Sequence, residues 1–172
     1  LGELLMRIAD VSREYLVGQI EAGAQALQLF DTWGGLLDAE RWRTIALPPL
    51  LHVLDAVAGK VPLLYYLNGG AHLWPEVKAL PVQGLGVDWR LPLSRVRELV
   101  GPRFVLQGNL DPAALLGPVE EIERRVDRLL VEGAGGGHVA NLGHGILPMT
   151  PVDHAKAFVR AVQSRSLRTV GT

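Results

Sequence analysis

Two segments place polar side chains directly after apolar stretches of the chain. In the first, His144 stands between Gly143 and Gly145, just after the segment His138–Leu142. Glycine on both sides lets the backbone approach a ligand closely and leaves the imidazole unshielded. His144 could therefore face a substrate carboxylate or donate a proton, and the alternative is a histidine held by a local hydrogen bond in a tight turn. On the residues alone both interpretations stay open.

The second segment is Asp31-Thr32-Trp33-Gly34-Gly35, which offers a carboxylate, a hydroxyl and two glycines. Without further information, an Asx-type turn in which Asp31 accepts local amide protons is the favoured interpretation. Asp88 and Asp111 also follow apolar segments. Asp111 precedes Pro112 and is more typical of a helix cap than of a catalytic group.

Other chemistries lack their signatures. The sequence contains no HExxH, no GxSxG and no GxGxxG that opens a helix, which argues against a zinc protease, an α/β-hydrolase and a dinucleotide-binding domain. His52, His72 and His154 fall in helical patterns without ligand spacing, so we expect surface or half-buried positions for them. No metal site is predicted.

The elements that must position these residues alternate along the chain. Five short apolar runs predict strands, and a segment with helical periodicity follows each of them. The predicted strands are Ala26–Phe30, Pro62–Leu67, Gln83–Val87, Phe104–Leu106 and His138–Leu142. The predicted helices are Glu3–Ala22, a stretch from Asp38 to Gly59 broken or restarted at Pro48-Pro49, Leu73–Leu80, Leu93–Val100, Val119–Leu130 and one that Thr150 caps.

This alternation predicts parallel βα units, hence an α/β fold in one domain, with function at the carboxyl ends of the strands. Two helical faces are predicted from apolar spacing. The first helix carries Leu4, Leu5, Ile8, Val11, Tyr15, Leu16 and Ile20, and the last turns Val152, Ala155, Val159 and Val162 inward.

Composition excludes several partners and compartments. The 172 residues carry 17 basic and 18 acidic side chains, a net charge of -1 that argues against nucleic acid or an anionic membrane as the main partner. The absence of cysteine excludes disulfides and thiolate sites and fits a reducing cytoplasm. The first residue is Leu1 rather than Met, which suggests a fragment or a processed chain.

Four segments together resemble the uroporphyrinogen decarboxylase family, in the family's order and across almost all of the chain. They are Gln25–Asp31 with Gly34 and Gly35, Gly86–Trp89, Leu106–Pro112 and Asn141–Pro148.

The resemblance implies a (β/α)8 TIM-type barrel and a carboxy-lyase. Such an enzyme removes the four acetate carboxyl groups of uroporphyrinogen III to give coproporphyrinogen III, in haem and chlorophyll biosynthesis. It implies no cofactor, because the pyrrole serves as its own electron sink: protonation of a ring carbon makes a cation from which CO2 can leave. A cytoplasmic homodimer is also implied.

The resemblance assigns two substrate-binding residues to this chain. Thr32 is expected to donate its hydroxyl to a substrate carboxylate, and His144 is expected to contact a substrate carboxylate or pyrrole edge. The family's arginine-containing loop, its pyrrole-binding aspartate and its pocket tyrosine are expected upstream of Leu1. A complete barrel needs eight βα units and at least ~200 residues. We therefore expect residues 1–172 to be the C-terminal part of one barrel domain, with about five βα units, an unpaired edge and no activity alone.

Two alternatives remain. Cobalamin- and folate-linked methyltransferases share this barrel superfamily, but their thiol-activating zinc sites use cysteine, which this chain lacks. A stoichiometric zinc content would favour them. The other alternative is a non-catalytic half barrel, either a scaffold or an inert fragment. It should show no saturable porphyrin binding that depends on Thr32 and His144.

Overall fold

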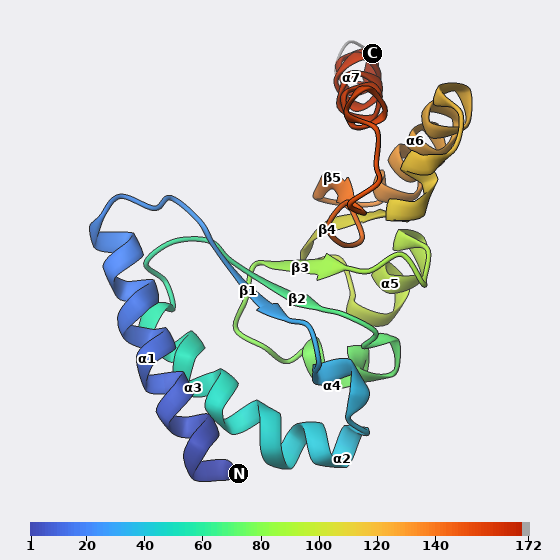
Figure 1. Ribbon diagram of the computed structural model, residues 1–172. Helices are drawn as coiled ribbons and strands as arrows, with labels where there is room; N and C mark the ends of the chain where they lie inside the picture. Colours follow the sequence, from blue (N-terminus) through green and yellow to red (C-terminus); the bar gives the residue numbers. More distant parts are fainter. Residues whose placement is uncertain (170–172) are drawn as a thin grey trace. The chain divides into compact units, whose positions relative to one another are not determined.

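Helices and strands alternate along the chain, as predicted (Figure 1). The computed structural model describes residues 1–169, with side chains as far as residue 165. The strands are β1 (Leu27–Asp31), β2 (Leu63–Leu67), β3 (Gly84–Val87), β4 (Val105–Leu110) and β5 (His138–Leu142). The helices are α1 (Gly2–Glu21), α2 (Ala39–Arg41), α3 (Leu47–Val57), α4 (Trp74–Val77), α5 (Leu93–Val100), α6 (Val119–Gly133) and α7 (Val152–Thr169).

The five strands form one sheet in the order β1-β2-β3-β4-β5. β1 pairs with β2 in parallel, with Leu27 opposite Leu63, and β4 pairs with β5 in parallel, with Leu106 opposite His138. Strands in chain order are what repeated βα units produce when each crossover moves in the same direction, as in the wall of a barrel. The predicted α/β class is confirmed.

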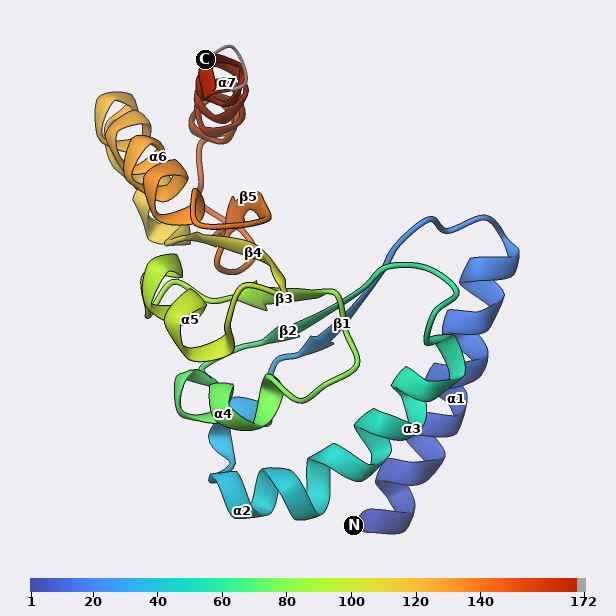
Figure 2. The same ribbon diagram turned by 180° about the vertical axis from the view of Figure 1, so that it is seen from behind.

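The chain divides into two compact units, and each is described separately. The first comprises Leu1–Leu85 and Leu99–Phe104, and the second comprises Gly86–Glu98 and the chain from Val105 on. In the first unit, α1 lies beside α3 (Figures 1 and 2). In the second, α6 packs with α7. None of the described helices is long and apolar enough to cross a membrane.

The prolines restart a helix rather than end one. After the single turn of α2, a π-helical turn over Trp42–Ala46 leads directly into α3, which holds Pro48 and Pro49 in its first turn. Amides in that turn have no intrahelical partner, so proline costs little there. The predicted restart is confirmed, and α3 buries Leu50, Val53, Leu54 and Val57.

The apolar face predicted for the first helix differs from the buried one. α1 buries Ala9 and Leu16, whereas Leu4, Ile8, Val11 and Tyr15 are between 53% and 68% exposed. Periodicity identifies a stripe of apolar side chains but cannot say which part of it finds a partner. The result is a row of exposed apolar residues along α1.

The buried face of α7 was also predicted wrongly. Ala157, Phe158 and Ala161 are buried, whereas Val152 is 69% and Val159 is 48% exposed. The expected cap is wrong too, because Pro151 directly precedes α7 and the Thr150 hydroxyl is buried without a hydrogen-bond partner among the described residues. α7 has apolar residues on more than one side, so spacing alone did not identify the packed side.

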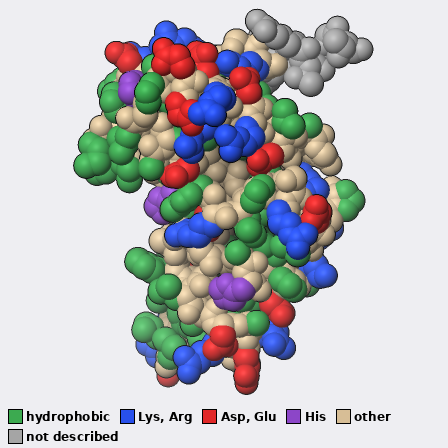
Figure 3. All heavy atoms as spheres, turned by 90° about the vertical axis from the view of Figure 1, so that its right-hand side faces the viewer, with side chains coloured by type: hydrophobic (Ala, Val, Ile, Leu, Met, Phe, Trp, Pro, Cys, Tyr) green, Lys and Arg blue, Asp and Glu red, His purple; other side chains and the backbone are tan. Residues whose placement is uncertain are grey.

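The helix predicted over Val119–Leu130 is confirmed as α6, which buries Ile122, Val126 and Leu129 at helical spacing. On its outer side Glu121 pairs with Arg124 and Arg125. Figure 3 shows acidic and basic side chains intermingled on the face that carries α6. Mixed charge of this kind is typical of a solvated helix.

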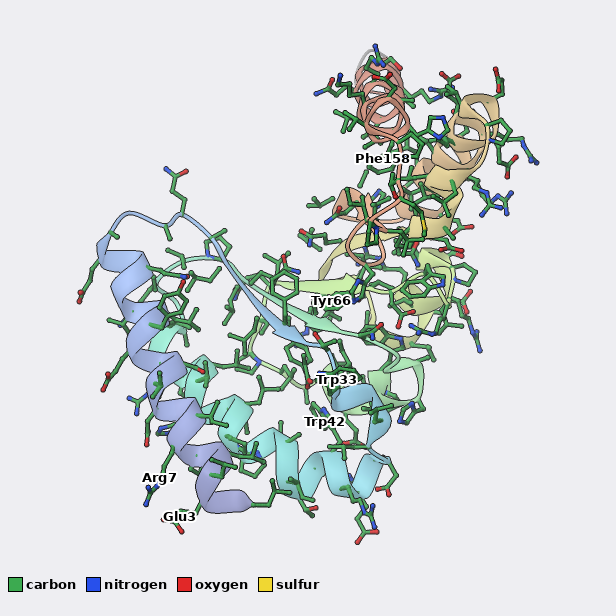
Figure 4. All side chains as sticks on the ribbon, in the orientation of Figure 1. Glu3, Arg7, Trp33, Trp42, Tyr66 and Phe158 are labelled. Atoms are coloured by element: carbon green, nitrogen blue, oxygen red, sulfur yellow. The ribbon has the colours of Figure 1, made fainter. Side chains whose placement is uncertain are left out.

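The α7 interface gives a direct stability test. Phe158, labelled in Figure 4, is 8% exposed, so Phe158→Ala should lower the free energy of unfolding by about 3 kcal/mol. Val159→Ala, next along the helix and half exposed, should cost less than about 1 kcal/mol. Urea denaturation of the two variants measures the difference. Equal losses would contradict the assignment of the buried face.

β4 is longer than predicted. The sequence suggests a strand that ends at Leu106, but pairing with β5 continues through Gln107, Gly108 and Asn109 to Leu110. The polar and glycine residues looked like a loop because they are uncommon in strands. Pairing with β5 compensates for that local preference.

Candidate functional site

Thr32 follows β1 in the first unit, in a loop that its neighbours hold in place. Asp31 Oδ1 accepts a hydrogen bond from the Gly34 amide at 2.7 Å, and the Thr32 carbonyl accepts one from Asn68 Nδ2 at 3.4 Å. Thr32 is half-buried. Its hydroxyl can donate a hydrogen bond to a ligand carboxylate.

The two glycines after Thr32 are required by close packing. A Cβ on Gly34 would lie 2.2 Å from Asp31 Oδ2, and a Cβ on Gly35 would lie 2.1 Å from the carbonyl oxygen of Asn68. Both distances are far below van der Waals contact, so any larger residue would displace the loop. The two glycines therefore restrict the backbone around Thr32 to a compact arrangement.

Tyr65 completes the cluster at the base of this loop. It is fully buried on β2, and its hydroxyl donates to Asp31 Oδ2 at 2.7 Å. Burial raises the pKa of Tyr65 well above its ordinary value of 10.0, and the negative charge of Asp31 raises it further. Tyr65 is thus a hydrogen-bond donor throughout the physiological range.

This raised pKa predicts a loss of stability in alkali. Above about pH 10 the unfolded chain releases the tyrosine proton while folded Tyr65 retains it, so the free energy of unfolding falls by about 1.4 kcal/mol per pH unit. Tyr65→Phe should remove that contribution, because phenylalanine has no proton to lose. Urea denaturation of both proteins between about pH 9 and about pH 11 measures the two slopes. Parallel slopes would contradict the assignment.

His144 follows β5 in the second unit and is exposed. Its Nδ1 accepts the amide proton of Gly145 at 2.8 Å, which places the proton of the neutral ring on Nε2. The ring meets Trp89 edge-on, with centroids 6.3 Å apart, and the Arg90 guanidinium lies 4.3 Å from the Trp89 ring centroid. His144 therefore presents an N–H donor beside an aromatic surface.

The backbone under His144 is tightly packed. A Cβ on Gly143 would lie 2.5 Å from the Trp89 amide nitrogen, so only glycine fits there. Asn109 is buried at the end of β4 and donates to the carbonyl oxygens of Asp88 and Leu91 at 2.8 and 2.6 Å. These contacts join the ends of β4 and β5 to the segment that follows β3.

The three aspartates at strand ends are structural. Asp31 accepts from the Gly34 amide, Asp88 from the Arg90 amide at 2.8 Å and Asp111 from the Ala113 amide at 2.9 Å. Asp88 is buried and also pairs with the Arg90 side chain at 3.1 Å. The predicted turn at Asp31 and cap at Asp111 are confirmed. The predicted surface or half-buried positions of His52, His72 and His154 are confirmed as well.

Two pockets of similar size lie near these strand ends, one in each unit. A pocket of about 180 Å³ in the first unit includes Asp31, Tyr65 and Phe30 in its lining. A pocket of about 190 Å³ in the second includes Trp89, Asn109 and Asp111. Neither pocket lining contains Thr32 or His144. The two residues belong to different units, so the surroundings of each are described separately.

Sequence reasoning missed the bond from Tyr65 to Asp31 and the contact between the Trp89 and His144 rings. Tyr65 lies in a strand-like apolar run, which by itself predicts only an ordinary strand residue. Parallel pairing places it opposite Leu29, two residues before Asp31 on the same strand, which brings the hydroxyl to the carboxylate. A tyrosine in a buried strand is a signal, since its hydroxyl needs a partner.

A parallel sheet in chain order, with hydrogen-bond donors and glycine-fitted loops after its strands, defines the class of α/β proteins that build a site from βα loops. The family model for uroporphyrinogen decarboxylase (URO-D) matches residues 1–165. The chain belongs to the uroporphyrinogen decarboxylase family.

Relatives in the same family support this. The uroporphyrinogen decarboxylase of Gloeobacter violaceus is 40% identical over 167 residues, and that of Syntrophotalea carbinolica is 43% identical over 163 residues. These alignments include 95% and 94% of this chain but 48% of each relative. The chain spans about half the length of the curated relatives it matches.

Solved structures share the fold. A methyltransferase from Methanosarcina mazei matches 92% of this chain with a TM-score of 0.80 at 24% identity, and 47% of that protein is covered. A B12-independent methionine synthase from Shewanella sp. W3-18-1 matches 98% of this chain with a TM-score of 0.73 at 12% identity, with 55% of it covered. At these identities the likeness concerns the fold alone.

Proposed function

We propose that residues 1–172 are the C-terminal part of a single barrel domain of a uroporphyrinogen decarboxylase. The whole enzyme removes the four acetate carboxyl groups of uroporphyrinogen III and yields coproporphyrinogen III, for haem or chlorophyll biosynthesis. We place it in the cytoplasm as a homodimer that needs no cofactor. The match to the family model over residues 1–165 carries this proposal.

Thr32 and His144 are the substrate-binding residues of this part. Thr32 carries a hydroxyl directly after β1, and the neutral His144 ring carries its proton on Nε2, because Nδ1 accepts from the Gly145 amide. Both groups are donors, which suits the carboxylates of a polyanionic tetrapyrrole. The family's arginine loop, aspartate and tyrosine are assigned to the half that this chain does not include.

The reaction needs positioning and charge stabilisation more than reactive side chains. Protonation of a pyrrole carbon makes a ring cation, the bond to the acetate carboxyl group breaks, and its electrons return to the ring as CO2 leaves. Donors that hold the carboxylates in place before the reaction reduce the cost of reorganisation. Thr32 and His144 would contribute this pre-organised binding.

The exposed apolar row on α1 is consistent with a surface that another part of the enzyme covers. The row consists of Leu4, Ile8, Val11 and Tyr15. β1 and β5 are the end strands of the sheet, each with one neighbour in it. Open strand edges and apolar rows are association surfaces. We propose that the other half of the barrel covers them, and that the 172-residue chain alone is inactive.

A hybrid protein tests the proposal. The half of the Gloeobacter violaceus relative that this chain does not match is joined to residues 1–172, and uroporphyrinogen III turnover is followed by separating the products. We expect turnover to coproporphyrinogen III by the hybrid and none by the 172-residue chain. A folded, monodisperse hybrid without turnover and without saturable porphyrin binding would favour a non-catalytic half barrel instead.

A further inference from the structure

Tyr65 on β2 bonds to Asp31 on the adjacent strand β1, and Asp31 directly precedes Thr32. It is fully buried on β2, and its hydroxyl donates to Asp31 Oδ2 at 2.7 Å. A buried hydroxyl without a partner would be costly, so this bond holds the side chains of both residues in one orientation. Asp31 lies at the end of β1, and the next residue is Thr32.

The Asp31 carboxylate uses both of its oxygens. Oδ1 accepts from the Gly34 amide at 2.7 Å, while Oδ2 accepts from Tyr65. A turn-capping aspartate needs only the first of these bonds. The second connects the loop 31–34 to the buried part of β2, so Thr32 lies inside a segment held at both ends by one side chain.

Two further observations restrict this segment. Gly34 and Gly35 fit so closely that a Cβ at either would overlap Asp31 or the backbone of Asn68. Trp42, on the π-helical turn that follows the loop, is fully buried (Figure 4). The hydroxyl of Tyr65 has Asp31 as its acceptor.

We propose that Tyr65 is a positioning residue, which sets the direction of the Thr32 hydroxyl toward a substrate carboxylate by fixing Asp31. The functional part of this inference rests on the proposed decarboxylase function. Tyr65 is fully buried and its hydroxyl is engaged by Asp31, so we assign it no direct contact with the substrate. Its effect on the reaction passes through Thr32 alone.

A double-mutant cycle in the hybrid protein tests the link. Tyr65→Phe removes one oxygen and should raise KM for uroporphyrinogen about tenfold, with a smaller change in kcat. Thr32→Val should have a similar effect. Because both act through one hydroxyl, Tyr65→Phe in the Thr32→Val background should change KM by less than about twofold. Thr44→Val, at an exposed position just before α3, is the matched control for Thr32→Val and should leave KM unchanged.

A second measurement separates this inference from the proposed function. Hydrogen exchange of the Gly34 amide in the 172-residue chain reports the bridge without any substrate. Tyr65→Phe should speed that exchange about tenfold or more, while amides of α6 keep their rates. Unchanged Gly34 exchange would overturn the positioning role even if the hybrid is active. Faster exchange in an inactive hybrid would uphold the bridge and count against the decarboxylase assignment.

Additive KM effects in the double-mutant cycle would also overturn the inference, because Tyr65 would then act by a route other than Thr32. Global unfolding of Tyr65→Phe would appear as faster exchange throughout the first unit, in β2 as well as at Gly34. In that case Asp31→Asn, which retains one acceptor oxygen, replaces it in the same cycle. Additive KM effects of Asp31→Asn and Thr32→Val would overturn the inference in the same way.

Discussion

Replacing Asp31 by alanine should lower the free energy of unfolding by about 3 kcal/mol. The substitution leaves two donors without an acceptor, the fully buried hydroxyl of Tyr65 and the amide of Gly34. Each buried orphan donor costs about 1–3 kcal/mol. Urea denaturation followed by circular dichroism measures the loss.

Asp55→Ala is the matched control, because Asp55 is an exposed aspartate on α3. It should change the free energy of unfolding by less than about 0.5 kcal/mol. Asp31→Asn should fall between the two, since its amide offers one acceptor oxygen for two donors. If Asp31→Ala and Asp55→Ala were equally stable, the carboxylate would not be the bridge described above.

Replacing His144 by alanine should raise KM for uroporphyrinogen about 10- to 100-fold in the hybrid protein. A hydrogen bond to a charged group contributes about 1.5–3 kcal/mol, and removal of the imidazole loses its Nε2–H donor. The fold should be little affected, because His144 is exposed. Steady-state kinetics of the folded variant provides the measurement.

His52→Ala is the control for His144. His52 lies on α3, where its ring contacts Asp10 at 2.7 Å and Arg13 at 3.0 Å, with no part in the proposed site. Its loss should leave KM within about twofold. An unaltered KM in His144→Ala would remove His144 from the substrate-binding residues and leave Thr32 as the only one in this chain.

Much of the fold could be predicted from local patterns. Each strand was recognised as a short apolar run, and α6 was recognised from its stripe of Ile122, Val126 and Leu129. The start of α3 at Leu47, just before Pro48 and Pro49, agrees with the missing amide protons of these prolines. These features depend on residues close together in the chain, so local physics suffices to predict them. The resemblance to the family, too, followed from the order of the four short segments named above.

Contacts between residues that lie far apart in the sequence could be learned only from the tertiary structure. Spacing marked apolar residues on α1 and α7, but which side is buried depends on the helix that packs against it, as Val159 and Phe158 show. In the same way, Asp31 was predicted to cap its loop, yet only the register of β1 on β2 brings the Tyr65 hydroxyl to its second oxygen. Sequence alone identified the candidate donors Thr32 and His144, because residue type and position at a strand end are local properties. The long-range contacts that orient them come from strand pairing and close packing, which no local pattern encodes.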